Sequence, residues 1–504
     1  MDKLRVILSA GAMLSLVAGT ANAGRLMDMQ GDPSSPTGSG IVNTVGGFQE
    51  MGSPYTGGQG LEGEGAAPFS VPAPGTINMR VNSFVNEFPM AAWWTGMNGT
   101  GTPASNAGNK QQAYGVYGWI RIDLGIDGMT KNGVQYGAFT EIRENNTTSI
   151  SGGTASLPGV TSTAATGLAG ASVTSGFAQS ASSDSSDNIL YVRHAFAYLG
   201  TTNTGFIRVG DIVYAQSLMQ IGLFDDFDIG GWISFASSNV PSNMAPTWPW
   251  ADEGGAYMAA GIAYLSPVVA GFDAVVSFIP NNSTPFDGSG CTSAYGGMAC
   301  ATQSSSQLAG DYSNRYRNEI AGAIRYRNTF GPVGVAMSGI WTTSGKVNSV
   351  ILTGPTTGQQ LYNGFNIGDV GAEVSFNKTI DVGGNLMWGA FNGNWGLKPT
   401  GGANAIAWTA GVKYTMPQIP ATIGTYYFNY LNQGAGPGPG LGQRTQQGID
   451  VGAVYGMGPG IVLVAEYAWG QNYQGGYDFL TASDGPLNNK VQAQVATVGM
   501  SLRF

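Results

Sequence analysis

The chain carries little charge. Only 10% of its 504 residues are Asp, Glu, Lys or Arg, whereas a soluble globular domain carries about 25%. The formal net charge is -9 at pH 7, and a chain without an excess of basic residues is a poor candidate for nucleic-acid binding. The aromatic content of 11% excludes a disordered chain. The composition therefore disfavours an ordinary soluble globular protein of this size.

Histidine is almost absent, since His194 is the single one in the sequence. Triad and metal chemistry depend on this residue type, and no Gly-x-Ser-x-Gly elbow accompanies it. Alternation puts His194 on one face of a strand with Leu190, Val192, Phe196 and Tyr198. We interpret this face as the outer one and His194 as part of an aromatic girdle. The sequence predicts neither an enzyme nor a cofactor.

Cysteine is also scarce, and both cysteines lie in one polar stretch. Cys291 and Cys300 are separated by eight mostly small residues. Two cysteines in one exported loop predict a disulfide that closes a short ring.

Long apolar runs are missing as well. A membrane helix needs about 20 apolar residues without breakers, and the nearest approach, residues 261–280, is interrupted by Pro267, Gly271 and Asp273. Lipid tolerates only helices and closed sheets, so a membrane-embedded form of this chain would be a β-barrel.

The N-terminus has the features of a secretory signal over residues 1–23. Lys3 and Arg5 precede an apolar stretch, and residues 21–23 form an Ala-Asn-Ala cleavage site. Residues 24–74 are rich in Gly, Ser and Pro. We interpret them as a flexible leader, with partial entry into the lumen as the alternative.

Apolar and polar residues alternate along much of the remaining chain, residues 75–504. In residues 119–126, Ile120, Ile122 and Leu124 share one face and Arg121 and Asp123 the other, which predicts a strand. Similar runs are found at 77–85, 134–143, 190–198, 320–327, 370–376, 408–414, 461–469 and 491–504. Part of the abundant glycine falls within such runs, as at Gly115, Gly118, Gly125 and Gly137, where it can ease curvature or close subunit packing.

The connections between these runs alternate in length. Short ones are predicted at 127–133, 200–205, 266–271, 328–332, 378–384, 416–421 and 455–460, and long ones at 89–110, 144–187, 212–253, 280–314, 342–366, 395–404, 432–444 and 471–489. Seven short and eight long connections give sixteen strands. Short turns at one end and long loops at the other are typical of outer-membrane barrels, so we predict an all-β, antiparallel transmembrane barrel.

The last run ends on an aromatic residue. Phe504 is preceded at every second position by Leu502, Met500 and Val498. A terminal Phe with this spacing resembles the signal that bacterial barrel-assembly machinery recognises.

Local motifs carry a resemblance to a known family. Residues 191–200, 205–211 and 501–504, with the acidic-aromatic-Gly-Gly stretch at 224–231, resemble general Gram-negative porins of the alphaproteobacterial type. The resemblance implies a sixteen-stranded homotrimer in the outer membrane, embedded in its lipid. It also implies that the third long loop, residues 212–253, folds into the barrel and narrows it.

A constriction of this kind works through a transverse field between acidic and basic groups. The acidic candidates on the loop are Asp225, Asp226 and Asp228, and the basic candidates on the wall are Arg80, Arg121, Arg143, Arg193 and Arg208. A charged side chain turned to lipid costs about 2 to 4 kcal/mol at the midplane, so we expect these arginines to face inward. Two alternatives stay open: the arginines pair with carboxylates such as Asp123 or Glu141 and only stiffen the wall, or the three aspartates bind calcium.

The predicted function is a water-filled channel for passive diffusion of ions and small hydrophilic solutes. A substrate-selective porin is the alternative within transport, because the many Trp and Tyr residues could stack against sugars in the lumen. A non-conducting structural or adhesive barrel is the alternative from another class. Ion preference does not follow from the sequence, because loops dominate the net charge.

Overall fold

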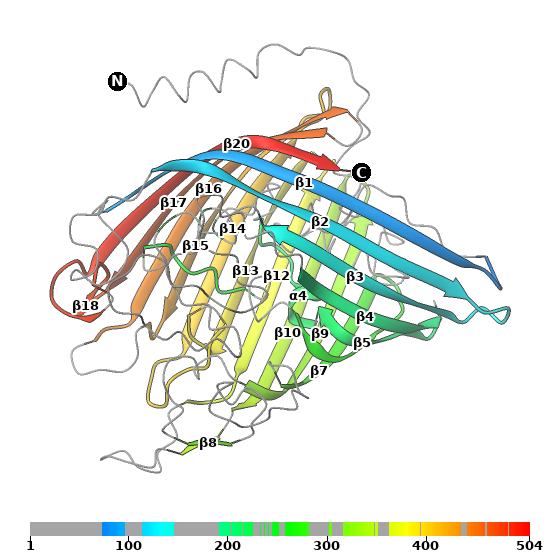
Figure 1. Ribbon diagram of the computed structural model, residues 1–504, viewed down its shortest axis with the longest axis horizontal. Coiled ribbons are helices and arrows are strands. Elements are labelled where there is room, and N and C mark those ends of the chain that lie inside the picture. Colours follow the sequence, from blue (N-terminus) through cyan, green and yellow to red (C-terminus); the bar gives the residue numbers. More distant parts are fainter. Residues whose placement is uncertain are drawn as a thin grey trace, which may run out of the picture.

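The computed structural model describes residues 73–95, 113–145, 191–201, 203–213, 215–224, 232, 236, 240, 244–250, 258–281, 302–304, 316–346, 348–350, 362–377, 379–393, 395–434, 441–458, 461–481 and 483–503 (Figure 1). Within these ranges, no helix is both long and apolar enough to cross a membrane. The predicted signal, residues 24–72 of the leader, both cysteines and Phe504 lie outside the described residues.

Sixteen antiparallel strands form a closed barrel in which each strand pairs with its neighbours in the chain. The last strand pairs with the first, with Glu87 opposite Met500, and this pairing closes the barrel. The strands are β1 (Ile77–Trp94), β2 (Tyr114–Met129), β3 (Gln135–Asn145), β4 (Tyr191–Thr201), β5 (Gly205–Val213), β6 (Met258–Leu265), β7 (Phe272–Asn281), β9 (Tyr316–Phe330), β10 (Val333–Lys346), β12 (Asn366–Phe376), β13 (Ile380–Ala390), β14 (Ala405–Thr415), β15 (Ala421–Asn432), β16 (Arg444–Gly458), β17 (Ile461–Gln474) and β20 (Lys490–Arg503).

The strand number and the alternation of connection lengths are confirmed. The connection between β9 and β10, for example, consists only of Gly331 and Pro332. Two small pairings in the long connections were not predicted. One is a parallel pair of β8 (Thr302–Ser304) and β11 (Asn348–Val350), and the other is an antiparallel pair of β18 (Tyr477–Asp478) and β19 (Ser483–Asp484).

The first strand is longer than the sequence indicated. We expected the long connection to begin at Pro89. Proline cannot donate to a strand ladder and is therefore rare inside a sheet. In the structure β1 continues to Trp94, and its pairing with β2 extends past the proline to Ala91, with Pro89 opposite Val116. Pairing with β20 is interrupted at Phe88 and Pro89 and resumes at Met90. The barrel thus accommodates the proline by omitting pairs on one side only.

The two faces of the barrel invert the pattern of a soluble protein. Large apolar side chains are exposed on the outside, including Met79 at 76% and Ile324 at 53%. Polar side chains are buried on the inside, including Asp369 at 1% and Glu373 at 2%. A continuous outer belt of exposed Ile, Val, Phe and Trp is stable only where lipid replaces water.

A bulge in β4 corrects the face assigned to His194. The register shifts between Glu141 and Ile142, so that Glu141 lies opposite His194 while Ile142 lies opposite Val192. Val192 is 58% exposed on the outer face, whereas Phe196 and Tyr198 are buried inside. The interpretation that these three residues share a face was therefore wrong, because the extra residue of a bulge reverses the alternation.

Candidate functional site

The third long connection enters the barrel and follows its inner wall. Its described residues are 215–224, 232, 236, 240 and 244–250, which we call the lumen segment, and nearly all of them are buried. The segment begins with the short helix α4 (Ala215–Met219), which packs against β7, β9 and β10 (Figure 1). The backbone N–H of Ala215 donates to Ser277 Oγ at 3.0 Å. The described part of the third long connection therefore lies in the lumen, as the family resemblance implied.

A polar node on the wall binds the start of the lumen segment. Asp369 Oδ2 accepts hydrogen bonds from Gln216 Nε2 at 2.7 Å and Gln220 Nε2 at 2.6 Å. Asp369 Oδ1 accepts from Asn385 Nδ2 at 2.8 Å, and the same Nδ2 donates to the Ile221 carbonyl at 3.1 Å. Hydrogen bonds to an ionised acceptor are stronger than those between neutral groups.

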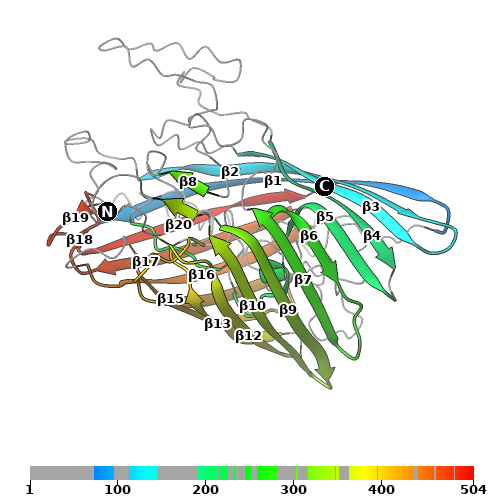
Figure 2. The same ribbon diagram turned by 90° about the horizontal axis from the view of Figure 1, so that it is seen from below.

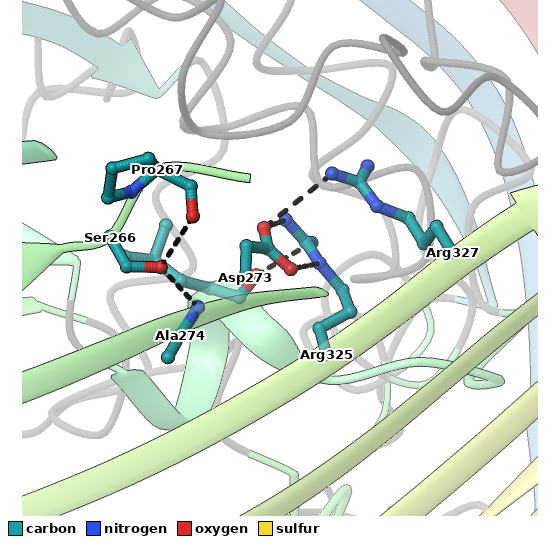
Figure 3. A network of polar contacts seen from close by, with 7 residues as sticks. Ser266, Pro267, Asp273, Ala274, Arg325 and Arg327 are labelled. Carbon is teal, nitrogen blue, oxygen red and sulfur yellow. Dashed lines mark hydrogen bonds and ion pairs between the residues drawn. The ribbon is translucent and has the colours of Figure 1, made fainter. Parts of the chain in front are cut away.

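An ion-pair network supports the same region from β7 and β9 (Figure 3). Arg325 donates to both oxygens of Asp273, with Nη2–Oδ2 at 2.7 Å and Nε–Oδ1 at 3.2 Å. Arg327 Nη2 lies 3.6 Å from Asp273 Oδ2. Arg325 Nη1 also donates to the Leu218 carbonyl of α4 at 3.3 Å. Beside this network, Ser266 Oγ accepts from the Ala274 N–H at 2.8 Å and so holds the turn that leads into β7.

Glycines on the inner wall leave room for the lumen segment. A Cβ on Gly411 would lie 2.5 Å from the Cβ of Phe224, and one on Gly470 would lie 2.6 Å from the ring of Trp232. A Cβ on Gly371 would overlap the Ile221 carbonyl. These glycines have a role that the sequence did not indicate, because they allow the segment to approach the backbone of the wall.

Tryptophans fix the far half of the lumen segment. Trp232 Nε1 donates to the Trp469 carbonyl at 2.9 Å, and Trp250 Nε1 donates to Asn385 Oδ1 at 2.6 Å. Trp248 packs edge-on against Phe428 with ring centroids 5.2 Å apart. The three tryptophans of the segment are at most 1% exposed, so they are packing anchors and offer no open face for a sugar.

The acidic candidates Asp225, Asp226 and Asp228 lie outside the described residues. The described residues on either side of them, Phe224 and Trp232, both pack on the inner wall.

The basic candidates all lie on β1 to β5. The structure describes the side chain of Arg208, whereas for the others it gives only the strand position: Arg80 lies opposite Gly125, and Arg121 lies opposite Arg143. Exposed Met79 and Ile126 occupy the alternate, outer positions of the same strands.

Arg193 falls at the bulge of β4, between the paired positions of Val192 and His194.

Arg208 faces the interior but is only 2% exposed, with its guanidinium carbon 5.1 Å from the centre of the Phe196 ring. Tyr198 lies opposite it on β4 and donates to Asp127 Oδ1 at 2.6 Å. Such a stacked, buried arginine stiffens the wall in addition to contributing charge.

The sequence missed the residues that bind the lumen segment to the wall. Asp369 precedes the run at 370–376, and extending that alternation by one residue would have placed it on the polar face. Nothing in the sequence indicated that it meets Gln216, because the two residues are 153 positions apart.

A closed sixteen-stranded sheet with an apolar outside, a polar inner wall and a chain segment folded inside defines a transmembrane diffusion channel. The sequence supports this class, because a family model described as Gram-negative porin matches residues 10–475. The chain belongs to the Gram-negative porin family. It is an outer-membrane porin for passive diffusion of ions and small hydrophilic solutes, and it is not an enzyme.

Similar solved structures include an anion-selective porin from Comamonas acidovorans, with a TM-score of 0.49 and 13% identity over 85% of this chain and 100% of that chain. A triple mutant of the Rhodopseudomonas blastica porin has a TM-score of 0.44 and 13% identity over the same shares of the two chains. No curated protein matches the sequence.

Proposed function

We propose that the third connection is the constriction of this porin, with Asp225, Asp226 and Asp228 facing the basic wall of β1 to β5. The observation that carries the proposal is the path of the lumen segment. Its hydrogen bonds run to β7, β9, β10, β12, β13, β15, β16 and β17, whereas the five candidate arginines lie on β1 to β5. Figure 2 shows these two arcs on different sides of the barrel, with β1 to β3 along one side and β10 to β15 along the other.

Charge of opposite sign across a narrow aqueous passage sets a transverse field. Such a field orders ions and dipolar solutes by charge while leaving their passage passive. Because the described tryptophans of the lumen segment are buried, size and charge are better supported than sugar stacking as the basis of discrimination. Calcium binding by the three aspartates remains the alternative use of that cluster.

The test replaces Asp225, Asp226 and Asp228 together by Asn and records single channels in planar bilayers under a salt gradient. We expect altered conductance and a reversal potential displaced toward anions, because negative charge is removed from the passage. The matched control is Asp484→Asn, an exposed carboxylate in the last long connection, which leaves the reversal potential unchanged. If the triple variant keeps both wild-type values, this segment is not the constriction. If withdrawal of calcium changes the wild-type channels and leaves those of the triple variant unchanged, the metal alternative is favoured.

We also propose that the porin assembles as a homotrimer and that Phe504, Leu502 and Met500 form its barrel-assembly signal. Glu87 supports a protein contact on the outer wall: it occupies the outer face of β1, half-buried, and its carboxylate lies against Gly118. A carboxylate on this face is costly in lipid and tolerable against another subunit. Electrophoresis of the unheated protein should show a trimer that Glu87→Lys weakens, and a monomeric wild type would contradict the assignment.

A further inference from the structure

We propose that Asp369 and Asn385 form one positioning site that holds both ends of the lumen segment and thereby sets the opening left for solutes. The inference rests on the proposed function, because it assigns the residues that keep the constriction in place. It concerns a position on the wall of β12 and β13, whereas the basic candidates named above lie on β1 to β5.

The first end of the segment is bound through the side chains of α4 and the residue that follows it. Gln216 and Gln220 both donate to Asp369 Oδ2. The orientation of the Gln216 amide is fixed, because Thr342 Oγ1 donates to its Oε1 at 2.6 Å and leaves Nε2 for the carboxylate. Two side chains about one helical turn apart are thus bound to one oxygen atom.

The far end of the segment reaches the same site from the other direction. Trp250 Nε1 donates to Asn385 Oδ1 at 2.6 Å, while Nδ2 of the same amide donates to Asp369 Oδ1. The amide of Asn385 therefore connects Trp250 to the carboxylate that holds Gln216. Residues 216 and 250 bracket the acidic candidates, so the chain between them is closed into a loop at this site.

The carboxylate of Asp369 does not pair with the residues directly opposite it on the adjacent strands. The register neighbours of Asp369 are Ile340 on β10 and Met387 on β13, both buried and apolar. Asp369 is 1% exposed, and its three described donors are Gln216, Gln220 and Asn385. Burying a charge is costly unless hydrogen bonds compensate it, and here two of the three come from the lumen segment. The barrel therefore supplies a buried carboxylate at this position, and the lumen segment supplies most of the hydrogen bonds that stabilise it.

The experiment compares single channels of the wild type with those of Asp369→Leu, Asn385→Leu and the double variant. Loss of one charge-assisted hydrogen bond shifts a two-state equilibrium by about tenfold, so we expect the time spent in sub-conductance states to rise by about tenfold or more in each single variant. Because both residues act at one site, the double variant should resemble the more severe single variant.

Thr409→Val is the matched control. Thr409 is also buried on the inner face, but its hydroxyl donates to the Tyr427 carbonyl of the adjacent strand, within the wall. Thermal unfolding followed by circular dichroism verifies that every variant retains the barrel. Steady channels of wild-type conductance in both leucine variants, or an equal change in Thr409→Val, would overturn the proposal.

Limited proteolysis with chymotrypsin, mapped by mass, gives a readout that does not depend on conduction. Release of the segment predicts new cleavage between residues 216 and 250 in the leucine variants and not in Thr409→Val. If the wild type fails to conduct, the proposed function is contradicted, yet the cleavage pattern still decides the positioning role: cleavage in the variants alone supports it, and no difference overturns it.

Discussion

Phe224 lies directly over Gly411 on the inner wall, so closely that a Cβ on Gly411 would come within 2.5 Å of the Cβ of Phe224. The lumen segment reaches β14 at this point because the wall has no side chain there. Lys413, two residues further on the same strand, places its Nζ 5.6 Å from the centre of the Phe224 ring. A side chain at position 411 would therefore occupy the space that Phe224 fills.

Replacing Gly411 by Val should displace Phe224 and change single-channel conductance. Overpacking a well-filled site costs about 1 to 3 kcal/mol, and the segment can relieve that cost by moving away from the wall. Gly339→Val is the control, because a Cβ there meets nothing within 4 Å. Equal conductance in the two variants would show that the aperture does not depend on this contact.

Removing the carboxylate shared by Arg325 and Arg327 should destabilise the barrel. Asp273→Leu leaves two buried guanidinium groups without their common partner, and breaking a buried pair in this way costs about 3 to 5 kcal/mol. The midpoint of thermal unfolding measures the loss. The double variant Asp273→Leu/Arg325→Met should recover part of the lost stability, because one of the two buried guanidinium charges is then removed. A double variant less stable than the single variant would contradict this account.

Neutralising a wall arginine should move ion preference in the direction opposite to that of the aspartate variant. Arg208→Gln removes positive charge from the β5 wall, so the reversal potential in a salt gradient should move toward cations. The shift should be small, since Arg208 is stacked on Phe196 and nearly inaccessible. A displacement toward anions would show that Arg208 does not contribute to the field as proposed.

The cysteine pair gives a prediction outside the described residues. Mass mapping without reductant should recover the peptides of Cys291 and Cys300 as one linked species. Reduction should separate them and leave conductance unchanged, because a short ring in the fourth long connection is remote in sequence from the lumen segment. Separate peptides before reduction would refute the disulfide.

Much of the fold follows from the sequence because it depends on local alternation and loop length. The connection between β9 and β10 was predictable, since Gly331 and Pro332 lie in the short stretch that follows the alternating run at 320–327. The bulge beside Arg193 was not, because one additional residue leaves the composition of a strand unchanged while reversing its faces.

The attachment of the lumen segment to the wall was beyond the sequence for a different reason. The abundance of glycine was evident, but whether a given glycine faces lipid or the interior depends on register. Gly411 becomes informative only when Phe224 is known to lie over it. Likewise, Asp369 and Gln216 meet across 153 residues, and no periodicity encodes a pairing at that distance.

The closure of β1 on β20 has a consequence for biogenesis. At this seam Thr497 Oγ1 donates to the Pro89 carbonyl, a contact that joins residues 408 positions apart. Contacts of such high sequence separation form slowly, since nearly the whole chain must be enclosed first. Until they form, the first and last strands present two unpaired edges, which are templates for pairing with another chain and which lipid does not tolerate. The nascent porin therefore depends most on chaperones before this seam forms. A chain that loses its last strand should be degraded by proteases rather than inserted.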